Sequence, residues 1–206
     1  MALSIEQGFA QRLAQGSILL GWTMVEQGQV AAGIAQMHQS VAAYGATGAD
    51  LGRSSHLALL AEAYRKGGQA EEGLPVLAEA LGVVDEHDIR FNEAELYRLK
   101  GELLLRQLAE RGSWLVDSTE PFKLPEVEHS VLTEAETCFR QALDSASRQG
   151  AKSLELRAAI SLSRLWQRQG MSAAARDLLA GIHGWFTQGF DTVDLQAAKA
   201  LLETLG

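Results

Sequence analysis

Three stretches of the chain share one arrangement of apolar and polar positions. Each has an apolar helix end, then a glycine turn, then the start of a second helix. They are LLGWTMVEQGQVAAG (19–33), LLAEAYRKGGQAEEG (59–73) and LSRLWQRQGMSAAAR (162–176). Similarity of a sequence to itself at a fixed interval is the signature of proteins built from stacked repeats. The pattern therefore predicts helical hairpins that recur along the chain.

The small and large residues of these hairpins keep one register. In the first helices, Gly21, Ala61 and Gly101 lie 40 residues apart, and Ser163 follows 62 residues later. The second helices carry a small and then a large residue in the same register, at Gly33 and Met37, Gly73 and Leu77, Ala135 and Phe139, and Ala175 and Leu179. Two antiparallel helices approach closely only where one presents a small side chain. The register therefore predicts the contact points within each hairpin.

The spacing within the third hairpin indicates an insertion. The two small residues lie 12 residues apart in three hairpins but 34 apart from Gly101 to Ala135, so 22 extra residues lie between them. This segment carries two of the three prolines, which interrupt helices. Its Trp114 and Phe122 either pack against their own repeat or serve as exposed anchors. As a single domain over 1–206, we expect the chain to hold hairpins near 11–45, 53–88, 92–149 and 153–187, an inserted loop near 107–131, and a capping helix over 192–205.

Residue types at the turns and contact points define the fold class. Gly28, Gly68 and Gly170 follow the first helices, where a left-handed residue ends a helix. We expect Tyr64 and Trp166, like Phe139, to fill the gaps opposite small residues. The interval of about 40 is longer than the ~34 residues of a standard tetratricopeptide repeat. We predict an all-α, tetratricopeptide-like right-handed α-solenoid of about four helix hairpins, closed by a capping helix after an Asp/Thr N-cap.

Composition and charge exclude several classes of partner. The 206 residues carry a formal net charge of −8, whereas nucleic-acid-binding proteins usually have a basic excess that attracts phosphates. No apolar run approaches the ~20 residues needed to span a bilayer. The first residues, MALSIEQGFAQRL, lack the basic flank and apolar core of a secretory signal, and a single cysteine fits a reducing compartment. We therefore expect a cytoplasmic protein that binds neither nucleic acid nor membrane.

Longer stretches resemble one bacterial family. They include GWTMVEQGQVAAGIAQMHQSVAAY, RLKGELLL followed by AETCFRQAL, AKSLELRAA and the terminal GWFTQGFDT. The family is the C-terminal tetratricopeptide region of large proteins that combine a class III adenylate/guanylate cyclase domain with a predicted signalling ATPase. The chain has no GxxxxGK[ST] phosphate loop, and the family's catalytic residues lie in the parts that are absent here. The resemblance implies a sensing or scaffolding portion of such a protein and supplies no catalytic residue.

Candidate catalytic and metal-binding residues have simpler explanations. No histidines pair at i, i+4, and His87 in DEHD (85–88) is expected at a solvated helix end instead of in a metal site. Cys138 lies beside Phe139, where a buried apolar thiol is the default and no activating base is indicated. We therefore expect no enzymatic activity, no metal and no cofactor.

Basic residues gather at the positions expected to line the concave surface of the solenoid. These inward positions hold seven basic residues against four acidic ones, although the whole chain is acidic. The predicted groove residues are Trp22, Arg65, Lys66, Arg98, Arg106, Arg157, Arg164 and Arg168. Arginine suits an acidic peptide, a C-terminal carboxylate or a phosphorylated ligand, because its planar fork can bind two oxygens at once.

A second interpretation of these charges stays open. Glu62, Glu95 and Glu102 could pair with the nearby arginines, in exposed ion pairs that contribute ~0–1 kcal/mol each and need no ligand. The fourth repeat, with three arginines and no acidic residue, is the hardest to neutralise internally.

Two functions follow from the predicted architecture. The first is a non-catalytic scaffold or regulatory module that binds a protein or peptide partner, acidic if the groove is basic, in signal transduction. The alternative is a self-association module that forms a homo-oligomer of the parent protein through the terminal repeat or through Trp185, Phe186 and Phe190, and exposure of these aromatics would favour it.

Overall fold

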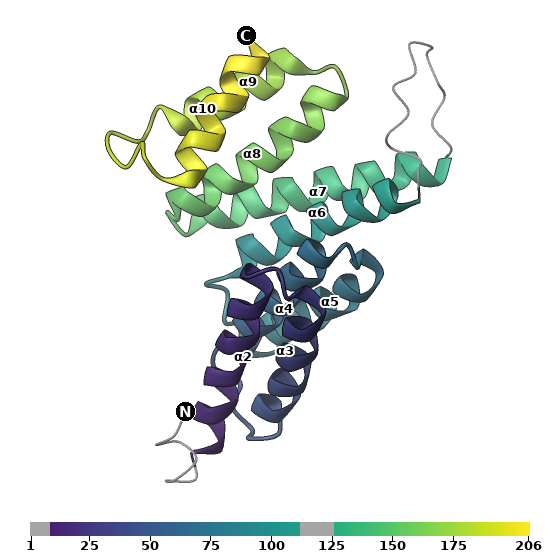
Figure 1. The fold of residues 1–206 in the computed structure, drawn as a ribbon. Coiled ribbons are helices and arrows are strands. Elements are labelled where there is room, and N and C mark those ends of the chain that lie inside the picture. The colour runs from purple at the N-terminus through teal and green to yellow at the C-terminus, as the bar shows by residue number, and fades with distance from the viewer. Residues whose placement is uncertain (1–8, 112–125) are drawn as a thin grey trace. The chain divides into compact units, whose positions relative to one another are not determined.

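The structure is a computed structural model that describes residues 9–111 and 126–206. Regular secondary structure in these residues is entirely α-helical (Figure 1). The helices are α2 (Ala10–Glu26), α3 (Val30–Gly45), α4 (Arg53–Gly67), α5 (Ala70–His87), α6 (Glu93–Glu110), α7 (Glu126–Arg148), α8 (Lys152–Arg168), α9 (Ser172–His183) and α10 (Val193–Leu205). They pack in consecutive pairs, which confirms the all-α, tetratricopeptide-like prediction.

The described residues divide into two compact units. Unit 1 holds residues 9–92 and 106–111, and unit 2 holds residues 93–105 and 126–206. Helix α6 contributes residues to both units. The single domain over 1–206 stays a prediction.

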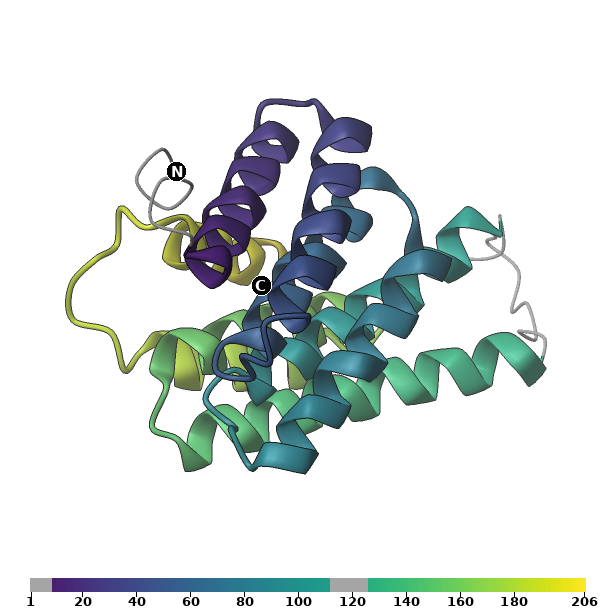
Figure 2. The same ribbon diagram turned by 90° about the horizontal axis from the view of Figure 1, so that it is seen from below.

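Helices α2 and α3 of unit 1 approach each other at two glycines. They run side by side in opposite directions (Figures 1 and 2). A Cβ atom added to Gly33 would lie 2.6 Å from the backbone oxygen of Gly21, and one added to Gly21 would lie 2.6 Å from the Cγ of Met37. Met37 is fully buried. The small residue of each helix therefore permits a backbone approach that no larger residue would allow, as the repeat register predicted.

The remaining pairs use the same positions with different residues. Ala61 and Leu77 are fully buried in the α4–α5 pair. In unit 2 the ring of Phe139 on α7 reaches within 2.5 Å of where a Cβ of Gly101 on α6 would stand. Ser163 on α8 is fully buried, and its hydroxyl donates a hydrogen bond of 3.1 Å to the backbone oxygen of Ala175 on α9. A small residue thus marks the contact point of every pair.

Two expected gap-filling residues behave differently. Phe139 is fully buried as predicted, but Tyr64 and Trp166 are only half-buried. The indole nitrogen of Trp166 instead donates a hydrogen bond of 3.1 Å to Glu136. Both side chains carry a polar group that needs a partner, so they lie at the margin of the core and not in its centre.

The turns after the first helices have the predicted backbone geometry. Gly28, Gly68 and Gly170 adopt φ values of +84°, +67° and +78°. This left-handed region is costly for a residue with a Cβ, which explains the glycine after α2, α4 and α8.

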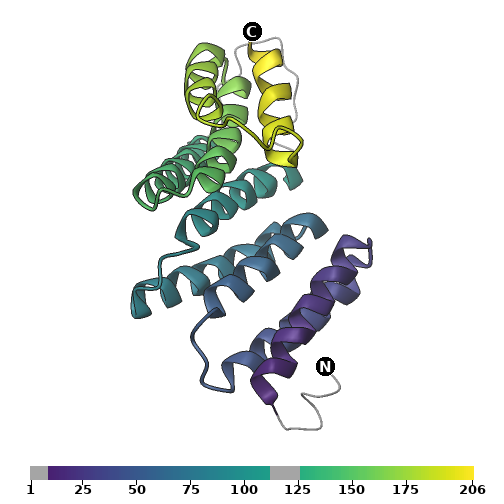
Figure 3. The same cartoon turned by 90° about the vertical axis from the view of Figure 1, so that its left-hand side faces the viewer.

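Helix α10 covers the fourth pair in unit 2. It lies beside α8 and α9 (Figure 3), and its Leu195, Leu201 and Leu205 join one buried cluster with residues such as Leu156 and Leu179. Thr192 occupies the predicted N-cap position, but its hydroxyl donates to the backbone oxygen of Gly189 and does not accept from the helix. The capping helix is therefore held by apolar burial and not by its N-cap side chain.

Both ends of the expected 107–131 loop in the third hairpin are helical, because α6 continues to Glu110 and α7 begins at Glu126. A repeat pattern gives no register inside an insertion, so it does not place these helix ends. Trp114 and Phe122 lie outside the described residues. In the described part of the chain, no helix has the length and apolarity that crossing a bilayer demands.

The α2–α3 contact supports a test of helix approach. Gly33→Ala should lower the free energy of unfolding by about 1–3 kcal/mol, because its new methyl group would meet backbone and overpack the contact. Gly82→Ala is the matched control: Gly82 lies inside α5 with nothing within 4 Å of its added Cβ, so the better helix former should stabilise by about 0.5–1 kcal/mol. Urea denaturation followed by circular dichroism measures both, and equal effects of the two variants would contradict this account.

Candidate functional site

The predicted groove residues fall into both units. Unit 1 holds Trp22, Arg65, Lys66 and Arg106, and unit 2 holds Arg98, Arg157, Arg164 and Arg168. The common concave surface across the eight residues stays a prediction.

In unit 1 the basic residues of α4 are engaged by neighbouring carboxylates. Arg65 makes a two-pronged contact with Glu62, its Nε and one terminal nitrogen each 2.7 Å from a carboxylate oxygen. Lys66 pairs with Glu26 of α2, and its ammonium lies 4.8 Å from the ring centroid of Trp22. Trp22 and Lys66 thus lie side by side, and neighbouring carboxylates compensate both Arg65 and Lys66.

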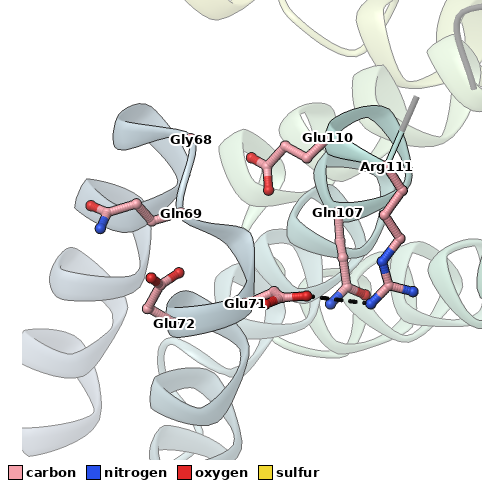
Figure 4. A pocket seen from close by; sticks show the side chains of 7 residues that line it. All are labelled: Gly68, Gln69, Glu71, Glu72, Gln107, Glu110 and Arg111. Atoms are coloured by element: carbon pink, nitrogen blue, oxygen red, sulfur yellow. Dashed lines mark hydrogen bonds and ion pairs between the residues drawn. The ribbon is translucent and has the colours of Figure 1, made fainter. Parts of the chain in front are cut away.

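Arg106 lies beside a small cavity in unit 1. Its Nε is 3.1 Å from Glu110, and a terminal nitrogen lies 3.0 Å from where a Cβ of Gly68 would stand. The cavity has a volume of about 250 Å³ (Figure 4) and is lined by Gly68, Gln69, Glu71, Glu72, Gln107, Glu110 and Arg111. Glu71 pairs with Arg111 at 3.4 Å. Three carboxylates against one lining guanidinium make this cavity acidic, which is opposite to the predicted basic groove.

Arg98 is the centre of a buried ionic cluster in unit 2. Its side chain is 6% exposed, and it donates to Glu95 at 2.8 and 2.7 Å and to Glu102 at 2.5 Å. Glu102 also accepts a hydrogen bond of 2.8 Å from the hydroxyl of Ser161 on α8. This burial conflicts with the prediction that Arg98 contacts a partner. The self-pairing interpretation is correct for Arg98, as it is for Arg65.

Arg157 extends this cluster across three helices. One of its terminal nitrogens lies 3.1 Å from Glu95 on α6, and its Nε lies 3.9 Å from Asp194 on α10. The expectation that Arg157 would be hard to pair internally is therefore wrong. Its carboxylate partners hold the guanidinium in place at the surface, where 36% of the side chain stays exposed.

Arg164 and Arg168 lie on the same side of α8 as Arg157. Residues at i, i+4, i+7 and i+11 lie along one face of an α-helix, so Arg157, Ser161, Arg164 and Arg168 form a line. Both arginines are exposed. Arg164 makes no ion pair with any residue in 9–111 or 126–206, whereas Arg168 takes part in an interaction within the protein. We call this line, from Arg157 to Arg168, the α8 arginine face.

Sequence reasoning missed two members of the cluster. Ser161 lies on α8 one turn before Arg164, and its role depends on Glu102 of another helix pair. Asp194 lies in α10, which is outside the repeat and so has no equivalent position from which its direction could be inferred. The i, i+4 spacing of Arg157 and Ser161 was the available signal, since it places both on one helix face.

The candidate reactive groups are placed in unreactive surroundings. Cys138 is buried, and this burial raises the pKa of its thiol to about 11, so the thiolate is disfavoured near neutral pH. His87 is the last residue of α5 and lies 3.7 Å from Asp50. Within the described ranges, no three His, Cys, Asp or Glu residues cluster in a way that could hold a metal ion.

The terminal aromatic residues in unit 2 are largely accessible. Trp185 is 60% exposed and Phe190 is 52% exposed, while Phe186 packs partly against the α8–α10 core. The rings of Trp185 and Phe186 meet edge to face at 5.2 Å, and Lys152 lies 5.8 Å from the ring of Trp185. We call Trp185, Phe186 and Phe190 the aromatic cluster.

Comparisons with known proteins show the fold. Two crystal structures of the nearly identical tetratricopeptide-like repeats of a Podosopora anserina protein, designated a kinesin light chain, are similar to this chain. One matches with a TM-score of 0.66 at 17% identity, covering 95% of this chain and 85% of the other. The second matches with a TM-score of 0.65 at 18% identity, covering 95% and 86%. No model of a protein family and no curated protein matches the chain.

The ionic cluster of unit 2 can be tested by substitution. Arg98→Met should lower the free energy of unfolding by about 3 kcal/mol, because it removes the cation between Glu95 and Glu102 and leaves partly buried carboxylates uncompensated. Arg140→Met is the matched control, since Arg140 is 59% exposed and pairs with Glu136 on the same helix. Such exposed pairs contribute ~0–1 kcal/mol. Urea unfolding of both variants measures the difference, and a loss below that of the control would show that the cluster does not stabilise the fold.

Proposed function

We propose that this chain is a non-catalytic protein-interaction module that binds an acidic segment of a protein partner on the α8 arginine face. The observation that carries the proposal is Arg164. It is exposed, it lies between Arg157 and Arg168 on one helix face, and it has no ion-pair partner in the described part of the chain. The other predicted basic residues of the four helix pairs mostly have carboxylates beside them.

The surroundings of the α8 arginine face favour recognition of carboxylates. Glu95 and Asp194 orient Arg157 without burying it completely, so 36% of its side chain stays accessible to a ligand. A held guanidinium loses less side-chain entropy on binding than a mobile one, and its fork matches a carboxylate or phosphate. A line of arginines along one helix face fits an extended acidic peptide that follows the helix.

The buried ionic cluster around Arg98 holds the α8 arginine face in a fixed position. Ser161 lies between Arg157 and Arg164 along α8 and hydrogen-bonds to Glu102, which also holds Arg98. The helix face is thereby fixed to α6 within unit 2. A binding surface on a rigid element needs less ordering when its partner arrives.

The setting of the interaction is proposed from the sequence resemblance. The stretches RLKGELLL, AETCFRQAL and GWFTQGFDT resemble the tetratricopeptide region of bacterial cyclase–ATPase signalling proteins. We infer that the chain serves in the cytoplasm as the sensing or scaffolding portion of such a protein, receiving a partner or an inducer. A reading frame that joins this region to a cyclase or ATPase domain would support this setting, and one that lacks both would contradict it.

A second candidate function is self-association through the aromatic cluster. The exposure of Trp185 and Phe190 favours it, because large aromatic side chains that remain accessible often mark an interface. In that case the module would oligomerise its parent protein.

The proposed acidic partner can be tested with a defined probe. We expect a fluorescein-labelled oligoglutamate peptide to bind the wild-type chain in a fluorescence-polarisation titration, and an oligoglutamine peptide not to bind. The double variant Arg164→Glu, Arg168→Glu should weaken binding of oligoglutamate about tenfold or more, because two attractive charges become repulsive.

A second double variant separates this site from overall charge. Arg140→Glu with Arg176→Glu changes the net charge by the same amount on other exposed positions of unit 2. The proposal requires this control to bind oligoglutamate nearly as well as the wild type. Equal weakening by both double variants would mean that binding reflects net charge and not the α8 arginine face.

A further inference from the structure

Helix α2 of unit 1 presents large apolar side chains to solvent. Phe9, which directly precedes the helix, is 52% exposed, and Leu19 and Leu20 in its middle are 51% and 48% exposed. The other side of α2 packs on α3 through Ile18, Gly21 and Val25. The exposed leucines therefore lie on a face that α3 does not cover.

The repeat register identifies the residues of α4 and α8 that are equivalent to this face of α2, so that their burial can be compared. Aligning Gly21 with Ala61 of α4 and Ser163 of α8 makes residues 16, 20 and 23 of α2 equivalent to 56, 60 and 63 of α4 and to 158, 162 and 165 of α8. At the middle position, Leu60 is 2% exposed and Leu162 is 1% exposed, against 48% for Leu20. The leucine at this repeat position is thus buried in α4 and α8 but about half exposed in α2.

A preceding helix pair covers the equivalent face elsewhere. Helix α4 packs against α3 and α2, with the ring of Tyr44 on α3 lying 4.5 Å from the ring of His56. In unit 2, α8 packs against α7. The face is therefore a helix-stacking surface in this protein, and on α2 no helix of the described residues occupies it.

Helix α10, which caps unit 2, differs from α2 because its solvent-exposed side is polar. Helix α10 buries its leucines against α8 and α9 and exposes polar residues such as Gln196, Lys199 and Glu203. On α2, by contrast, Leu19 and Leu20 are about half exposed, and such an apolar face fits an interface better than a solvated surface.

We propose that this face binds a second copy of the chain, with the two α2 helices packed antiparallel across a two-fold axis near Leu19. Arg12, Leu19 and Glu26 lie seven residues apart and so share one side of the helix. Antiparallel pairing centred on Leu19 places Arg12 of one copy opposite Glu26 of the other, twice by symmetry. These are the only charged residues of α2, so the pairing is complementary and has no like-charge contact along the helix.

The charges remain available for this contact. The guanidinium of Arg12 has a hydrogen bond of 3.1 Å to Gln15 and no carboxylate beside it among the described residues. Glu26 pairs with Lys66 through one carboxylate oxygen, which leaves the second oxygen for a guanidinium. Both residues are exposed. The apolar contact supplies the attraction and the charge pair selects the antiparallel orientation.

Sedimentation equilibrium of the full chain at a series of concentrations tests the proposal. We expect a monomer–dimer equilibrium for the wild type, and a dissociation constant raised about a hundredfold by Leu19→Glu with Leu20→Glu, because two buried apolar contacts per copy become charged. Both leucines are exposed in the single chain, so circular dichroism at concentrations where the wild type is monomeric should show an unchanged helical signal and melting temperature.

A charge exchange provides an independent readout. Arg12→Glu alone should weaken the dimer about tenfold, and Arg12→Glu combined with Glu26→Arg should restore most of the loss, since the opposite pair re-forms across the axis. A fold defect would not be rescued in this way. Because Glu26 pairs with Lys66 in its own chain, Lys66→Glu is added to the combined variant to keep that pair, and failure of this variant to recover would overturn the antiparallel arrangement.

The aromatic cluster serves as the control surface. Trp185→Ala with Phe190→Ala should leave the dimer unchanged if α2 forms the interface. A wild type that stays monomeric at every concentration, or a dimer that only the aromatic variant dissociates, would overturn the proposal. Binding of oligoglutamate to the α8 arginine face is measured separately, so either proposal can fail without the other.

Discussion

The close approach of two helices at a small residue is the constraint on which the fold depends. Gly21, Ala61, Gly101 and Ser163 are all buried, and none could be replaced by a large residue without moving backbone or a buried side chain. Because an α-helix has a fixed rise and twist, one such contact determines which residues of each helix face inward. The remaining faces are then left for stacking, for capping or for solvent.

This constraint leaves most of the sequence unspecified, which explains the low identity to structures of the same fold. The Podosopora anserina repeats share 17–18% identity with this chain across nearly its whole length. The pairing needs a small residue, a facing large residue and a glycine turn, and it tolerates different residues elsewhere. Arg98 illustrates this tolerance, since its equivalents in the other first helices are Ile18, Ala58 and Ile160. Two carboxylates compensate the buried guanidinium that replaces these apolar side chains.

The sequence predicted those parts of the fold that repeat. The small contact residues, the left-handed glycines and the capping helix each have either an internal equivalent or a local signal. The bounds of the third-hairpin insertion had neither, and α6 and α7 continue further into it than expected. The partial exposure of Tyr64 and Trp166 was not predicted. A repeat register shows that a position holds a large residue, but it does not show whether the polar atom of that residue has a partner in the core.

The candidate site was less predictable than the fold for a related reason. The partner of a charged side chain depends on which helices lie side by side, and this is decided by packing beyond a single hairpin. Local spacing was sufficient for Arg65 with Glu62 and for Arg98 with Glu95. It could not indicate that Glu95 would also hold Arg157, or that Asp194 of the non-repeating α10 would approach it. Arg164 kept its predicted character, because no carboxylate of the described residues pairs with it.

Nuclear Overhauser effects between Gly101 and Phe139 test the central claim most directly. The Phe139 ring lies against the backbone of Gly101, so the α-protons of Gly101 should show strong effects to the ring protons and an upfield ring-current shift. A Phe139 ring with no such effects, or one whose contacts lie with a different helix, would contradict the claim that small residues set the distance between paired helices.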